Sequence, residues 1–61
     1  MNKRDYRLEA IDWADEAHKA RVEGDKAGAI NLYRQAWEYA RKGNAPILAK
    51  VLNTHIELLS V

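Results

Sequence analysis

The sequence predicts an all-α fold, a three-helix antiparallel bundle, from three observations. Small and apolar residues recur at steps of three and four along three segments, which is the spacing of one helix face. The segments are separated at Gly24 and at residues 43–46, and both interruptions are short enough to be turns between antiparallel helices. The chain has 61 residues, the size of one small domain. We therefore expect residues 1–61 to form a single domain with helices at about 4–23, 26–42 and 45–59.

The first predicted helix covers about residues 4–23. Aromatic and small residues form its inward side: Trp13, Ala17 and Ala20. Asn2 or Lys3 is expected near its N-terminal cap, and Gly24 suits the left-handed residue that ends a helix. Acidic residues at steps of four, three and four follow one flank: Asp5, Glu9, Asp12 and Glu16. We interpret this acidic row as a face in contact with solvent.

The second predicted helix covers about residues 26–42. Asp25 precedes it and can accept hydrogen bonds from the amides of its first turn. Small and aromatic residues form its inward side: Ala29, Tyr33, Ala36 and Trp37. We expect both tryptophans to pack in the core rather than to stack on a ligand. Gly43 tolerates the conformation that ends the helix, and Asn44 can cap the next one.

The third predicted helix, at about residues 45–59, begins at Pro46, which needs no amide partner in a first turn. Its apolar residues cover about half of its circumference, more than two neighbouring helices shelter. We assign Leu52 and Ile56 to the core. The remaining aliphatic residues form a predicted partner-binding surface: Ile47, Val51 and Leu58. This excess of apolar surface predicts a homodimer.

Charge and composition exclude several classes of function. Ten lysines and arginines face nine acidic residues, for a net charge of +1, so no strong field attracts nucleic acid. The chain has no cysteine, which removes disulfides and thiolate chemistry. No apolar run approaches the roughly 18 residues of a membrane span. We expect a cytoplasmic protein that binds neither nucleic acid nor the membrane interior.

Catalytic and metal-binding patterns are absent from the sequence. The only aliphatic hydroxyls belong to Thr54 and Ser60, and neither has a histidine and an acid at productive spacing. Asp15 and His18 share a helix face, but no second acid and histidine pair completes a metal site. Residues 24–28 have the glycines of a phosphate-binding loop without the lysine and hydroxyl that complete it, so we interpret them as a turn. We predict no enzyme activity and no cofactor.

Small and aromatic residues connect the first two helices at steps of four, three, nine, four and three: Trp13, Ala17, Ala20, Ala29, Tyr33 and Ala36. This series resembles the tetratricopeptide repeat over about residues 10–43. The resemblance implies a closely packed helical hairpin, followed by a further or capping helix. The ligand-facing positions of that family correspond here to Ile11, Ala14, His18 and Arg21. Such a mixed apolar and cationic surface suits a peptide with an apolar anchor and an acid.

Residues 22–39 also resemble the microtubule-interacting-and-transport domain. That family is a three-helix bundle of similar length, and residues 50–59 look similar to its third helix. The resemblance implies binding of helical or extended peptide segments in grooves between helices.

The sequence therefore predicts a protein–protein interaction module that self-associates, binds a peptide or helix of another protein, or does both. Two alternatives stay open at this point. The first alternative is a small regulatory protein of phage or plasmid type that inhibits a larger enzyme by occluding its surface, and the second is an engineered single repeat.

Overall fold

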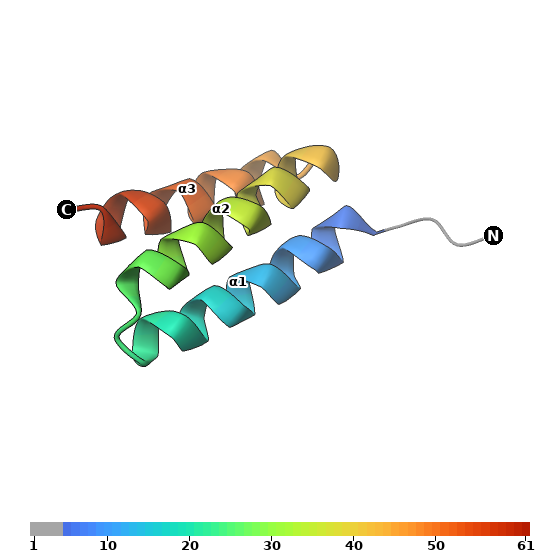
Figure 1. The fold of residues 1–61 in the computed structure, drawn as a ribbon. Helices are drawn as coiled ribbons and strands as arrows, with labels where there is room; N and C mark the ends of the chain where they lie inside the picture. The colour runs from blue at the N-terminus through green and yellow to red at the C-terminus, as the bar shows by residue number, and fades with distance from the viewer. Residues whose placement is uncertain (1–4) are drawn as a thin grey trace.

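The computed structural model describes residues 5–61, which form three α-helices and no strand. These are α1 (Tyr6–Val22), α2 (Lys26–Lys42) and α3 (Pro46–Leu59). Helices α1 and α3 both run antiparallel to α2 and pack against it, and they make almost no contact with each other (Figure 1). The predicted all-α bundle is confirmed, in the form of a layer with α2 in the middle.

Helix α1 begins at Tyr6 rather than at about Arg4, because Asp5 is its N-cap. The Asp5 backbone is extended, and its carboxylate accepts hydrogen bonds from the amides of Arg7 at 3.1 Å and Leu8 at 3.4 Å. These bonds satisfy two of the free amides that start every helix. Asn2 and Lys3, the predicted caps, lie outside the described residues.

The turn between α1 and α2 follows the predicted chemistry. Gly24 has a φ of 88°, in the left-handed region that glycine adopts without strain. Asp25 then caps α2 by accepting a hydrogen bond from the Gly28 amide at 2.9 Å. A Cβ atom at Gly28 would collide with the Asp25 carboxylate, so this glycine leaves room for the cap. Residues 24–28 thus have a structural role in starting α2.

The turn between α2 and α3 differs from the prediction at two residues. Gly43 has an ordinary φ of −83°, and Asn44 takes the left-handed conformation with a φ of 55°. Asparagine is among the residues that tolerate this region. The N-cap of α3 is therefore Ala45, which makes no side-chain capping hydrogen bond, and Pro46 occupies the first turn. The prediction that Asn44 caps α3 was wrong, because Asn44 ends α2 instead.

The buried core consists mainly of alanine. Its members are Ala10, Ala17, Ala20, Ala29, Tyr33, Ala36, Ala40, Ala49, Leu52 and Leu59. Small residues at a helix contact let the two backbones approach closely, which leaves little room for larger groups. Trp13, Trp37 and Ile56 accordingly pack against this core from its edge and are only partly buried. Most of the large aliphatic side chains remain on the surface.

Candidate interaction surfaces

Helix α3 carries an exposed row of residues that we call the α3 stripe: Ile47, Val51, Thr54 and Leu58. At 100° per residue these positions fall on one side of the helix, opposite Ala49 and Leu52. The exposed fractions are 80% for Ile47, 48% for Val51 and 63% for Leu58. Because α2 contacts only the opposite side of α3, the stripe has no covering element within residues 5–61.

Polar groups on and beside the α3 stripe are compatible with a protein contact. The Thr54 hydroxyl donates a hydrogen bond to the Lys50 carbonyl at 3.1 Å, so this hydroxyl already has a hydrogen-bond partner within the helix. Lys50 and Glu57 are seven residues apart and lie on one flank of the stripe. Both are exposed, and no ion pair engages either of them in the described part of the chain.

Helix α1 presents a second group of predicted contact residues. Ile11 is 52% exposed, and His18 and Arg21 are also exposed. Leu8 and Val22 extend the apolar part of this surface, on the side of α1 away from its buried alanines. Because α1 and α3 lie on different sides of α2, the six predicted contact residues form two groups on separate helices.

The acidic side of α1 is partly neutralised within the helix. The Lys19 ammonium lies 3.4 Å from the Glu16 carboxylate and 3.5 Å from that of Asp15. The hydrogen bond and negative charge of Glu16, with a smaller contribution from Asp15, raise the pKa of Lys19 above its ordinary value. All three groups are exposed, so these pairs contribute little to stability.

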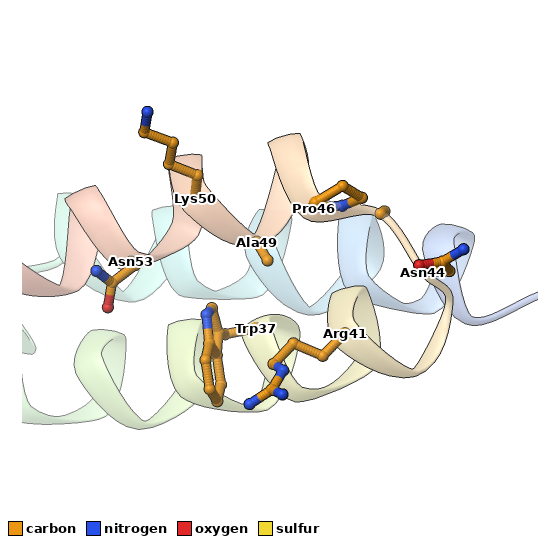
Figure 2. A pocket seen from close by; sticks show the side chains of 8 residues that line it. Trp37, Arg41, Asn44, Pro46, Ala49, Lys50 and Asn53 are labelled. Carbon is orange, nitrogen blue, oxygen red and sulfur yellow. The ribbon is translucent and has the colours of Figure 1, made fainter.

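An open cleft of about 520 Å³ lies at the surface along the contact between α2 and α3, near the turn that joins them (Figure 2). It is lined by Trp37, Arg41, Asn44, Ala45, Pro46, Ala49, Lys50 and Asn53. In Figure 2 the indole of Trp37 lies along α2, the amide of Asn53 points from α3 toward α2, and Lys50 points away from α2. The cleft therefore combines a flat apolar ring with amide groups and with cations at its edge.

Trp37 has a cationic neighbour in this cleft. The Arg41 guanidinium carbon lies 5.0 Å from the centre of the indole, within the range of a cation–π interaction. A smaller depression of about 270 Å³ adjoins the cleft at Trp37 and is also lined by Arg34, Glu38 and Ile56. Arginine and lysine outnumber acids along this lining, so it is complementary to an acidic ligand.

Two further groups of ring contacts involve Tyr39 and His55. The Tyr39 ring stacks on Tyr6 and Trp13 of α1, with centroid distances of 5.9 Å and 6.3 Å. The His55 ring stacks on buried Tyr33 at 5.1 Å, which gives this histidine a packing role between α2 and α3. These contacts fix the two outer helices against α2.

Neither a metal-binding cluster nor a membrane-spanning helix is found in the described part of the chain. No group of three or more histidine, cysteine or acidic residues within residues 5–61 is placed to hold a metal ion. No helix in the same range has the length and apolar character needed to cross a bilayer.

Comparison with known proteins gives no relative from which a function is transferred. The chain matches no family model, and no curated protein or solved structure is significantly similar to it. The resemblances to the tetratricopeptide repeat and to the microtubule-interacting-and-transport domain therefore stay predictions from residue spacing.

Proposed function

We propose that this protein is a cytoplasmic interaction module that forms a homodimer through the α3 stripe. The observation that supports the proposal is the distribution of side-chain size. Alanines fill most of the core, while Ile47, Val51 and Leu58 are about half exposed or more. Full burial of a fully exposed side chain of this kind contributes roughly 1.5 to 3 kcal/mol, and a contact that covers all three gains the share that corresponds to their remaining exposure.

The position of the α3 stripe also supports a protein partner. Its three aliphatic residues lie on one helix face, with Thr54 between Val51 and Leu58, whereas isolated exposed apolar residues are common on any protein surface. Charged residues border the stripe on one side, as at the polar rim of a protein interface. A helix that presents anchors at this spacing is a common means of recognition between proteins.

Replacing Ile47, Val51 and Leu58 together by glutamine tests this function. We expect the wild-type chain to gain mass with concentration in sedimentation equilibrium between about 20 µM and 1 mM, and the triple variant to remain a monomer throughout. Glutamine keeps a high helix propensity and all three sites are exposed, so the monomer should stay folded.

The matched control changes Leu8 and Val22 of α1 to glutamine. This control removes exposed aliphatic groups from α1 and should dimerise as the wild type does. Loss of the dimer in the control alone would place the contact on α1. A wild-type chain that stays monomeric at the highest concentration would contradict the proposal.

The cleft between α2 and α3 favours a second candidate function, the binding of an acidic peptide with an apolar anchor. Trp37 offers a partly buried ring for the anchor, Arg41 lies against that ring, and Arg34 and Lys50 are among the other lining residues. A peptide of the same chemistry is predicted from the sequence to bind at Ile11, His18 and Arg21 on α1. The cleft suits such a peptide better than this surface does, because residues of two helices line the cleft.

Tryptophan fluorescence tests this second function. In a Trp13→Phe background, Trp37 is the only reporter, and we expect a blocked octapeptide of alternating glutamate and leucine to shift its emission saturably. The matching peptide of alternating lysine and leucine should leave the Trp37 emission unchanged. Arg41→Gln should weaken binding about tenfold, since it removes a cation beside the ring. Arg21→Gln on α1 is the control, and equal weakening by both variants would argue against the cleft.

A further inference from the structure

The α3 stripe is self-complementary when two copies of α3 lie antiparallel. Its steps of four, three and four residues are those of alternating d and a positions in a heptad, so Ile47 and Thr54 share one type of position. Val51 and Leu58 share the other type. An antiparallel pair places each d position opposite an a position, which sets Ile47 against Leu58 and Thr54 against Val51. Two-fold symmetry repeats both contacts, so every residue of the stripe has a partner.

The charges beside the α3 stripe fit the same register. Lys50 and Glu57 lie on one flank, and in this register Lys50 of each copy is opposite Glu57 of the other. Figure 2 shows Lys50 directed away from α2, where a second α3 would approach. A parallel pair would instead place Lys50 near His55 and away from Glu57 of the other copy. Charge complementarity therefore favours the antiparallel arrangement.

We infer that two copies of the chain pair through antiparallel α3 helices, with Ile47 of each opposite Leu58 of the other. This inference rests on the proposed self-association and assigns its geometry. Antiparallel packing also places the positive end of each helix dipole beside the negative end of the other. The contact spans about three helical turns, less than a standard interface of roughly 1,600 Å², so we expect a dissociation constant on the order of 100 µM.

Disulfide trapping tests the orientation directly, because the natural chain has no cysteine. Ile47→Cys and Leu58→Cys are made as separate proteins and mixed under mild oxidation. An antiparallel pair joins one variant to the other. It holds two copies of the same variant about 16 Å apart at the substituted site, too far for a disulfide. Since the two variants have equal mass, one is labelled with ¹⁵N so that mass spectrometry separates mixed from identical pairs.

Charge exchange tests the register independently. Glu57→Lys places like charges together twice in each dimer, and we expect it to weaken the dimer about tenfold at low salt. Lys50→Glu should have the same effect. The double variant with both changes restores opposite charges and should return to within about threefold of the wild type. High salt should reduce the differences between all four proteins.

Each outcome of the two tests has one meaning. Mixed disulfides together with rescue by the double variant support the antiparallel register. Disulfides only between identical variants establish a parallel pair. If the wild-type chain dimerises but neither disulfides nor charge effects are seen, the contact lies elsewhere. Either of these last two results overturns the inference and leaves self-association standing, whereas a chain that stays monomeric overturns both.

Discussion

Replacing Ala36 with leucine is expected to destabilise the fold by about 3 kcal/mol. Ala36 has no exposed surface and lies among the alanines that allow the helices to approach closely. Three added heavy atoms have no space there. Helix α2 must therefore shift against its neighbours, or the surrounding side chains must leave their rotamer minima. A domain of 61 residues has a total stability of only about 3 to 9 kcal/mol. Urea denaturation followed by circular dichroism should show a large fall in the midpoint, or no folded baseline.

Ala27→Leu is the matched control, because Ala27 lies in the same helix and is exposed. The added atoms meet solvent, and leucine has nearly the helix propensity of alanine. We expect a change within about 0.5 kcal/mol. Similar unfolding midpoints for Ala36→Leu and wild type would mean that the seam between the helices is looser than the burial of Ala36 implies.

Replacing Leu52 with alanine is expected to cost about 3 kcal/mol, through lost apolar burial and the cavity that remains. Leu52 is the largest side chain that is fully buried, with 2% exposure, and it holds α3 against α2. Helix α3 packs on α2 with almost no support from α1. We therefore expect amide hydrogen exchange to accelerate more in α3 than in α1, measured at a concentration where the chain is monomeric.

Leu8→Ala serves as the control for this second change, because Leu8 is 59% exposed on α1. It removes the same atoms from a site where they gain little from folding, so the unfolding midpoint should hardly move. Equal acceleration of exchange in all three helices of Leu52→Ala would show that α3 and the α1–α2 pair unfold only together.

The sequence predicts the first turn well and the second turn poorly, for a physical reason. Gly24 and Asp25 have local functions, a left-handed backbone and a capping carboxylate, that depend on little beyond the adjacent residues. At the second turn two residues compete for the left-handed position. Pro46 restricts the residue before it to extended conformations, which fixes Ala45 as the N-cap. The left-handed residue is then Asn44 and not Gly43.

The tryptophans illustrate a limit of periodicity. Helical spacing places Trp13 and Trp37 on inward faces, and both do contact the core. Periodicity does not report the distance between helix axes. Where alanines bring the axes together, as Ala17 and Ala36 do here, a large ring on the same face is displaced to the edge of the contact.

The α3 stripe can be predicted from the sequence more directly than the cleft can. The α3 stripe is predictable from spacing, because a helix with apolar residues on both sides must expose some of them when one side is buried. The cleft depends on which residues of α2 lie opposite which residues of α3. Counting outward from Ala45 in the second turn pairs Trp37 with Asn53 and Arg41 with Ala49, so these cleft residues can be predicted once the position of the turn is known.

The near absence of contact between α1 and α3 has a consequence for how quickly the chain reaches its native state. Nearly all tertiary contacts join helices that are neighbours along the chain, so little loop-closure entropy is lost before packing begins. Proteins with such short-range contacts fold in microseconds to milliseconds. Ultrafast temperature-jump relaxation, rather than stopped flow, is the appropriate kinetic method for this protein.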